Sequence, residues 1–230
     1  MPAPNPAWLT PSWTASPACS APTNLRAAAV VPAIDEFGLI AELFAPLAES
    51  YPGALGLTDD CALVSSLPGT SIAVTADAIV AGVHFLADDP PDLIARKLLR
   101  VNLSDLAAMG AVPFAVLMTA AFPRGTNAAW LRAFAEGLRQ DLTAFAVALI
   151  GGDTVATPGP LTLSVTAMGR VEEGGALRRS AARPGDLLFV SGSLGDAALG
   201  LRALQGGLPG LPAEAAAFLI DRSRVPRPRL

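Results

Sequence analysis

The apolar positions in the middle of the chain recur with the spacing of two amphipathic helices separated by a strand. The first helix is predicted over residues 92–110, because a proline precedes it and a glycine ends it. The unbroken apolar segment 114–122 predicts a buried strand. Asn127 is a good N-cap for the second helix, which is expected to run to about residue 145. Its expected buried stripe is Trp130, Leu131, Phe134, Leu138 and Leu142.

Shorter elements are expected on both sides of this unit. A helical pattern begins at Asp35 or Glu36, and Pro46 is expected to kink or shorten its last turn. Further strands are predicted at 71–76, 147–150 and 161–170, and the last alternates apolar with hydroxyl side chains. A short strand after the loop 56–60 is close enough to 71–76 for a hairpin, which would bring Asp60 and Asp77 towards one end of a sheet.

The order of elements predicts an α+β fold, a mixed sheet with flanking helices, in three segments. Residues 1–32 are expected to be a disordered leader rich in proline and alanine. Residues 33–180 are expected to form a first α+β domain. Residues 181–230 are expected to begin a second α+β domain, with a strand at 187–190 and helices after it. This second domain is expected to be incomplete, because so few elements cannot close a core alone.

Composition narrows the function classes. Hydrophobic residues make up 52% and the net charge is −4, which argues against a general nucleic-acid-binding surface. The cysteines, Cys19 and Cys61, have no metal-type spacing, so a reducing cytoplasm is expected. The single histidine excludes a His-rich metal site. The uncharged segment 106–123 is interrupted by Gly110 and Pro113, so we expect a helix end and a strand, not a membrane span.

Four aspartates in short apolar contexts carry the candidate chemistry. They are Asp60, Asp77, Asp105 and Asp153, beside glycines, alanines or hydroxyl residues. Asp105 lies among small and apolar neighbours, so we expect its carboxylate to be neutral, paired or metal-bound. Oxygen ligands favour Mg²⁺, which typically joins a few carboxylates to substrate phosphates. The alternative for each aspartate taken alone is an ordinary turn or cap residue.

Phosphate-binding motifs of the common kinds are missing from the sequence. It contains neither a G-x-x-x-x-G-K-[ST] loop nor a G-x-G-x-x-G loop that opens a helix. A nucleotide enzyme of this kind would hold phosphates through Mg²⁺ and a few basic groups, for which Arg178 and Arg179 are candidates. A solvated pair is the equal alternative for these arginines. His84 follows Asp77 in a polar loop, and nothing local establishes it as a general base.

Taken together, six ordered segments resemble the thiamine-monophosphate kinases, a family within the superfamily of aminoimidazole-ribonucleotide synthetase and selenophosphate synthetase. The resemblance covers about residue 34 to the C-terminus. The segments that carry it are Asp35–Ile40, Gly56–Ala62, Thr75–Asp77 with Gly82–Phe85, Val101–Ala111, Ile150–Thr154 and Ser191–Asp196.

The resemblance implies MgATP-dependent phosphorylation of thiamine monophosphate to thiamine diphosphate by direct in-line transfer. It also implies a homodimer in which the first domains of two subunits pair their sheets into a barrel. The implied Mg²⁺ ligands are Asp60, Thr75, Asp77, Asp105 and Asp153. Gly152, Asp153 and Arg179 are the implied ATP contacts, and His84 is the implied contact to thiamine phosphate.

The sequence departs from the family pattern at three places. Ala76 stands where the family usually has a hydroxyl residue, and Leu57-Thr58 stand where Ile-Gly is usual. The family's second-domain motifs, Asp-Ile-Ser-Asp-Gly-Leu and Gly-Gly-Glu-Asp-Tyr, do not occur. Two alternatives to the kinase therefore remain: another ATP-dependent synthetase of the superfamily, and a truncated nucleotide-binding remnant without turnover.

Overall fold

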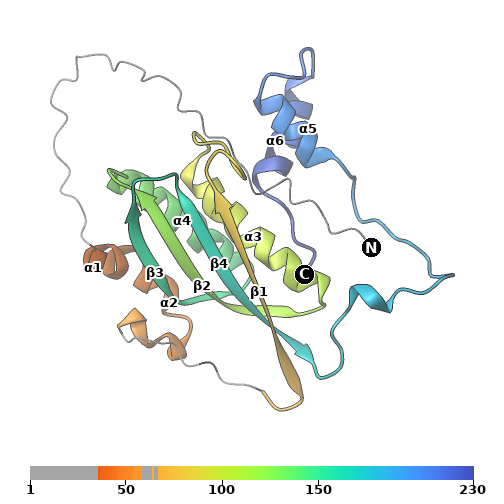
Figure 1. Ribbon diagram of the computed structural model, residues 1–230, viewed down its shortest axis with the longest axis horizontal. Coiled ribbons are helices and arrows are strands. Elements are labelled where there is room, and N and C mark those ends of the chain that lie inside the picture. Colours follow the sequence, from red (N-terminus) through yellow and green to blue (C-terminus); the bar gives the residue numbers. More distant parts are fainter. Residues whose placement is uncertain (1–35, 59–63, 65–66) are drawn as a thin grey trace, which may run out of the picture. The chain divides into compact units, whose positions relative to one another are not determined.

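A four-stranded mixed sheet forms the centre of the computed structural model, which describes residues 36–58, 64 and 67–230 (Figure 1). Its strands lie in the order β1-β4-β2-β3. Both β1–β4 and β4–β2 are antiparallel, whereas β2 and β3 are parallel. The bounds are β1 Thr70–Val80, β2 Val112–Pro123, β3 Ala148–Thr157 and β4 Thr162–Glu172. The predicted α+β class and mixed sheet are confirmed.

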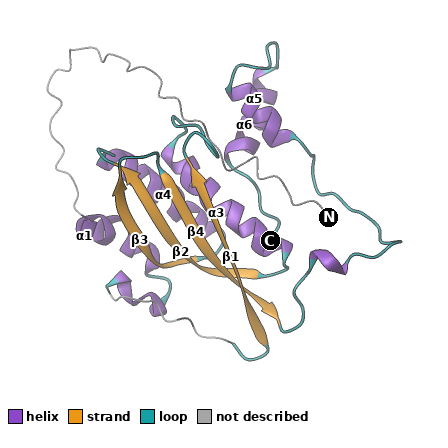
Figure 2. Ribbon diagram, in the orientation of Figure 1, coloured by secondary structure: helices purple, strands orange, loops and turns teal. Residues whose placement is uncertain are grey.

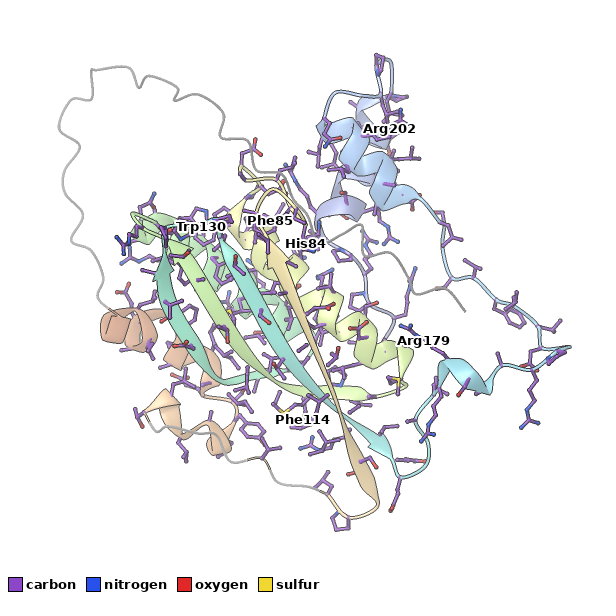
Figure 3. All side chains as sticks on the ribbon, in the orientation of Figure 1. His84, Phe85, Phe114, Trp130, Arg179 and Arg202 are labelled. Carbon is purple, nitrogen blue, oxygen red and sulfur yellow. The ribbon has the colours of Figure 1, made fainter. Side chains whose placement is uncertain are left out.

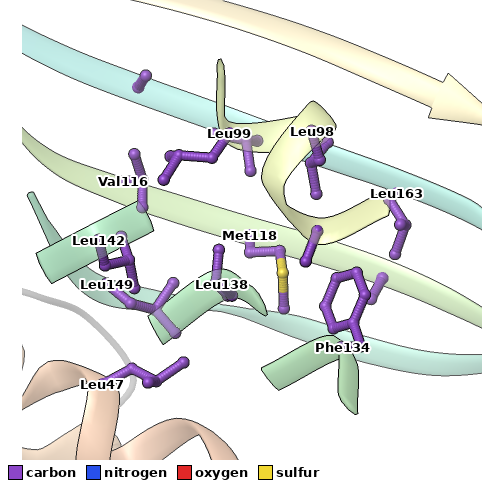
Figure 4. Close-up of a cluster of buried hydrophobic side chains, with 14 of the residues drawn as sticks. Leu47, Leu98, Leu99, Val116, Met118, Phe134, Leu138, Leu142, Leu149 and Leu163 are labelled. Atoms are coloured by element: carbon purple, nitrogen blue, oxygen red, sulfur yellow. The ribbon is translucent and has the colours of Figure 1, made fainter. Parts of the chain in front are cut away.

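Two long helices, α3 (Pro91–Ala108) and α4 (Ala128–Ala144), cover one face of this sheet (Figure 2). The Oδ1 atom of Asn127 accepts a hydrogen bond from the backbone N of Trp130 at 2.9 Å, which confirms the predicted N-cap. The core between helices and sheet consists mainly of aliphatic side chains together with Phe134 (Figure 4). Its fully buried members include Leu98, Leu99, Leu103, Val116, Phe134, Leu138 and Leu163.

The first described residues form a broken helix beside β3. It consists of α1 (Glu36–Leu39), a π-helical turn (Ile40–Phe44) and α2 (Ala45–Ala48), followed by the 3₁₀ segment Pro52–Leu57. The π turn ends two residues before Pro46, the residue at which a kink is predicted. A second apolar cluster lies here and comprises Ala48, Ala54, Phe114, Ala115, Ala148 and Ile150.

Strand boundaries differ from the predictions. β1 continues past Asp77, and β3 continues through Gly151, Gly152 and Asp153, which were expected to follow the strand. Within the described residues β1 pairs with β4. The first strand of the expected hairpin falls mostly on residues 61–63, which lie outside the described part.

The strand predicted at 187–190 is wrong. These four residues have no ladder partner, and their side chains are 65–96% exposed. An apolar segment becomes a strand only where another strand supplies hydrogen bonds to it, and the described chain supplies none here. The segment lies between the 3₁₀ turn Arg179–Ala181 and the helices α5 (Asp196–Leu204) and α6 (Ala213–Arg224).

All described residues belong to one unit, because the chain's contacts divide it between Pro32 and Ala33. The expected boundary near residue 180 stays a prediction. Among the helices that the structure describes, every one is too short or too polar to cross a bilayer.

An ion cluster joins α3 to α4. Asp141 is only 1% exposed, and its carboxylate accepts hydrogen bonds from Arg96 and from two nitrogens of Arg100. Arg100 also donates to the backbone O of Pro226 at 3.2 Å, and Arg224 pairs with Asp89 at 2.7 Å. The chain after α6 is therefore held against the start of α3.

Replacing Asp141 with alanine is expected to lower the free energy of unfolding by about 3–5 kcal/mol, because two arginines then lose their buried counter-charge. Urea denaturation followed by circular dichroism measures the change. The control is Glu136→Ala on the same helix, which breaks an exposed pair with Arg139 and is expected to change stability little. Equal losses in the two variants would contradict the buried cluster.

Candidate functional site

A cluster of oxygen atoms lies where β1 meets the second half of α3. The Oγ1 atom of Thr75 donates a hydrogen bond to Oδ2 of Asp105 at 2.9 Å, although the two residues are 30 positions apart. Asp77 lies two residues after Thr75 on the same strand, so its side chain lies on the same face. Three of the five expected metal ligands are thus brought together. We call Thr75, Asp77 and Asp105 the β1-edge cluster.

Asn102 fixes this cluster and was missed from the sequence. Its side chain is fully buried on α3, about one helical turn before Asp105. Its Oδ1 accepts a hydrogen bond from the backbone N of Asp77 at 2.9 Å, and its Nδ2 donates to the backbone O of Leu98 at 3.0 Å. The signal available in the sequence was Asn102 itself, a side-chain amide among the apolar positions of the helix that also carries the candidate ligand Asp105.

The environment of Asp105 differs from the expectation. Its side chain is exposed at the surface of α3, and its described partner is the neutral hydroxyl of Thr75. Burial therefore does not force this carboxylate to be neutralised, because α3 turns its apolar residues towards the sheet and leaves position 105 outside. An exposed carboxylate is available to bind a cation.

His84 lies in the tight turn after β1, near the start of α3 (Figure 3). Its Nδ1 accepts a hydrogen bond from the backbone N of Val80 at 3.1 Å. A neutral His84 ring therefore carries its proton on Nε2 and presents a donor. Lys97 of α3 donates from Nζ to the backbone O of His84 at 2.7 Å. Burial lowers the pKa of the Lys97 ammonium from its usual range, and nearby Asp89 acts in the opposite direction.

Arg179 lies beyond the other end of α3 (Figure 3). The backbone N of Leu177 donates to the backbone O of Met109 at 3.0 Å, so the segment after β4 meets the end of α3. Arg179 is exposed in the short turn that follows. Arg179 therefore lies beyond the same end of α3 that carries Asp105.

Asp153 lies at the opposite edge of the sheet. It pairs in register with Thr119, which pairs with Ser164, which pairs with Ala78. This row of paired residues crosses all four strands and ends at Ala78. Ala78 follows Asp77 in the chain, so its side chain points to the opposite face of the sheet from that of Asp77. Asp153 and the β1-edge cluster are therefore separated by the width of the sheet and by the sheet itself.

A cavity of about 570 Å³ adjoins Asp153. Its walls are mostly apolar, and the side chains include Ile40, Phe44, Leu117, Met118 and Met168. Thr154 also lines it, and the Thr154 hydroxyl is buried without a hydrogen-bond partner among the described residues. The cavity suits a flat apolar ring that offers a hydrogen-bonding group.

Gly152 has a packing reason to be glycine. A Cβ atom at this position would lie 1.8 Å from the backbone O of Met118 on the neighbouring strand. The absence of a side chain lets β3 approach β2 and carries Asp153 to the cavity rim.

The donor set of the β1-edge cluster fits a hard cation. All of its side-chain donors are oxygens, as Mg²⁺ requires, and phosphate oxygens typically complete such a site. Within the described residues, no three His, Cys, Asp or Glu side chains lie close enough together to form a metal site alone. The expected ligand Asp60 lies outside the described residues. The metal assignments stay predictions.

Comparison with known proteins gives consistent matches. Residues 58–171 match the family described as "AIR synthase related protein, N-terminal domain". The thiamine-monophosphate kinase of Caulobacter vibrioides is 43% identical over 223 residues. That match covers 97% of this chain and 59% of the relative. The chain thus spans about three fifths of the length of this curated relative.

The comparison with solved structures agrees with the comparison of sequences. The thiamine-monophosphate kinase from Stenotrophomonas maltophilia has a TM-score of 0.65 and 42% identity, covering 74% of this chain and 55% of that one. The structure of AaThiL complexed with AMPPCP and TMP has a TM-score of 0.65 and 28% identity. It covers 84% of this chain and 60% of that one.

Replacing Asn102 with alanine is expected to free β1 from α3. The Asp77 amide loses its acceptor, so the free energy of unfolding should fall by about 1–3 kcal/mol. Amide hydrogen exchange at Asp77 should accelerate more than exchange along β4. Ser104→Ala, at an exposed position of the same helix, serves as the control. Unchanged exchange at Asp77 would contradict the tether.

Proposed function

Because the chain belongs to the thiamine-monophosphate kinase family, we propose that it carries the metal- and ATP-binding part of an enzyme that phosphorylates thiamine monophosphate. The observation that carries this proposal is the β1-edge cluster, in which Asn102 holds the Asp77 strand against the helix of Asp105. Asp77 and Asp105 present carboxylate oxygens, and Thr75 fixes one of them by its hydrogen bond.

In this proposal Asp60, Thr75, Asp77, Asp105 and Asp153 hold Mg²⁺. The bound ions would neutralise the phosphate oxygens during transfer. The chain's own contribution is positioning: the strand and the helix fix the ligands before substrate arrives. Arg179, at the same end of α3 as Asp105, contributes a planar guanidinium for phosphate oxygens.

The adenosine half of ATP fits the cavity beside Gly152 and Asp153. An adenine ring is flat and largely apolar at its faces, which matches Phe44, Met118 and Met168. The buried Thr154 hydroxyl supplies a hydrogen-bonding group for the ring edge. This assignment accounts for a buried hydroxyl that has no hydrogen-bond partner among the described residues.

His84 is assigned to the thiamine phosphate. The hydrogen bond from Val80 to Nδ1 leaves Nε2–H directed away from the turn, where it can donate to a phosphate oxygen. Lys97 holds the backbone of the same turn from α3. His84 lies near the start of α3, and Asp105 lies in the last turn of this helix. In the proposed direct in-line transfer, the phosphoryl group passes from ATP to thiamine monophosphate without a covalent enzyme intermediate.

The proposal includes a homodimer, which is supported by apolar side chains that the described residues leave exposed on the sheet face opposite α3. Ile72 and Val74 of β1 are 36% and 61% exposed, and both point away from α3. β1 is also an edge strand, with backbone groups on its outer side free of β partners within the described chain. Exposed aliphatic groups beside an open edge favour association with a second copy.

Asp105→Asn is expected to weaken MgATP binding on the order of 10- to 100-fold while the fold is kept, since one carboxylate is lost without a change in size. Isothermal titration calorimetry measures the affinity, and circular dichroism checks the fold. Asp88→Asn, in the exposed turn before α3, is the matched control. An unchanged affinity in Asp105→Asn would remove this residue from the site.

Val74→Arg is expected to convert the dimer into a folded monomer, because it places a charge in the proposed interface. Light scattering after size-exclusion chromatography gives the mass. Val83→Arg, at a 73% exposed position in the turn after β1, should leave the dimer intact. A dimer that survives Val74→Arg would place the interface elsewhere.

A further inference from the structure

We propose that Arg224 of α6 positions His84 indirectly: it occupies the carboxylate of Asp89, and this leaves Lys97 to hold the turn that carries His84. The inference rests on the proposed function, in which His84 contacts thiamine phosphate. It adds a positioning residue from a helix that the proposed function does not otherwise use.

His84 is held in its turn by the backbone of β1 and by the side chain of Lys97 (Figure 3). Its backbone N donates to the backbone O of Val80 at 3.0 Å, and its Nδ1 accepts from the backbone N of Val80 at 3.1 Å. The Nζ atom of Lys97 donates to the backbone O of His84 at 2.7 Å. A hydrogen bond from a charged donor is stronger than a neutral one, so losing it loosens the turn that directs Nε2.

Asp89 is a second acceptor within the influence of the Lys97 ammonium. It lies at the end of the same loop and is only 7% exposed. Its Oδ2 accepts from the backbone N of Leu86 at 2.9 Å, and its Oδ1 accepts from Nε of Arg224 at 2.7 Å. Burial lowers the pKa of the Lys97 ammonium and the charge of Asp89 opposes this change, so the two groups attract each other. A buried carboxylate needs a cation, and Arg224 supplies it.

No other cation of this region is available to take the place of Arg224. Among the described residues, Arg224 is the one basic side chain in an ion pair with Asp89. The other basic side chains in this part of α3 are arginines already bound to the buried carboxylate of α4, Arg96 and Arg100. The flexible ammonium of Lys97 is left as the cation on which Asp89 acts. Loss of Arg224 therefore draws Lys97 away from the carbonyl of His84 and towards Asp89.

The end of α6 is fixed at this place by two contacts. Arg224 is the last residue of α6, so its ion pair with Asp89 brings the end of the helix to the loop before α3 (Figure 1). Two residues later, the backbone O of Pro226 accepts a hydrogen bond from Arg100 of α3 at 3.2 Å. The guanidinium of Arg224 is thus held against the loop rather than free in solvent.

Arg224→Gln tests the arrangement by leaving Asp89 buried without its cation. We expect the Kd for thiamine monophosphate to rise about tenfold, as the loss of one hydrogen bond to a charged group allows. The Kd for MgATP should stay within about twofold, because the contacts proposed for it lie elsewhere. Arg224→Lys restores a cation and should recover most of the affinity. Calorimetry measures both constants, and circular dichroism checks the fold.

The matched control is Arg227→Gln, which removes the same charge from an exposed ion pair with Asp221 three residues further along the chain. It is expected to change neither Kd. Unchanged affinity for thiamine monophosphate in Arg224→Gln would overturn the proposal.

A double variant separates positioning from a general loss of structure. When Asp89→Asn is added to Arg224→Gln, no carboxylate competes for Lys97, and the asparagine side-chain oxygen still accepts from the backbone N of Leu86. The affinity for thiamine monophosphate should therefore return to near the wild-type value. If Arg224 acted only by docking α6, the affinity would stay low in the double variant, and this result would overturn the proposal.

A measurement without ligand separates this inference from the proposed function. The chain contains one lysine and one histidine, so side-chain NMR signals from protein labelled in these two amino acids report Lys97 and His84 alone. In Arg224→Gln we expect the Lys97 signal to shift. Amide exchange at Val80, the donor to the His84 ring, should accelerate about fivefold or more, and both changes should reverse in the double variant.

An unchanged Lys97 signal together with unchanged exchange at Val80 would overturn the positioning role. The expected changes, found in a protein that does not bind thiamine monophosphate, would support the positioning of His84 and overturn only its proposed ligand.

Discussion

Side chains alternate between the two faces of a β-strand, and this alternation together with strand order divides the acidic residues of this protein into two groups. Thr75 and Asp77 face α3 at one edge, and Asp153 faces the other way at the opposite edge. No rotamer change brings these groups together, because the strands and the packed core lie between them. The proposed metal ligands of one chain therefore lie at two separate places on the sheet.

Helix α3 is the platform on which one of these groups is built. Its apolar side is buried against the sheet, and Asn102 ties it to β1 through the Asp77 amide. At its other side Arg96 and Arg100 bind the buried Asp141 of α4. Asp105 is left exposed between these attachments. A helix fixed on both sides presents its carboxylate in a defined position, which lowers the cost of ordering a ligand.

The sequence predicted the long amphipathic helices, the Asn127 cap and the alternating strand β4, because each rests on a local pattern sustained over many residues. The sequence-based prediction failed where contacts with residues far apart in the chain decide the local structure. Gly152 and Asp153 continue β3 because the glycine, which has no side chain, lets β3 lie close to the backbone of Met118. The apolar segment 187–190 stays unpaired because the described part of the chain supplies no neighbouring strand. The cluster at β1 was expected from the resemblance, but the position of Asp153 depends on strand order, which no local pattern encodes.

Paramagnetic broadening by Mn²⁺-ATP is the most direct measurement of where the nucleotide binds. Amide signals of the isotopically labelled protein would be recorded with increasing Mn²⁺-ATP, in the wild type and in the Asp105→Asn variant. The account predicts that the amides of Asp77 and Asp105 broaden in the wild type at concentrations that leave them sharp in the variant. Equal broadening in the two proteins, or broadening at neither residue in the wild type, would contradict it.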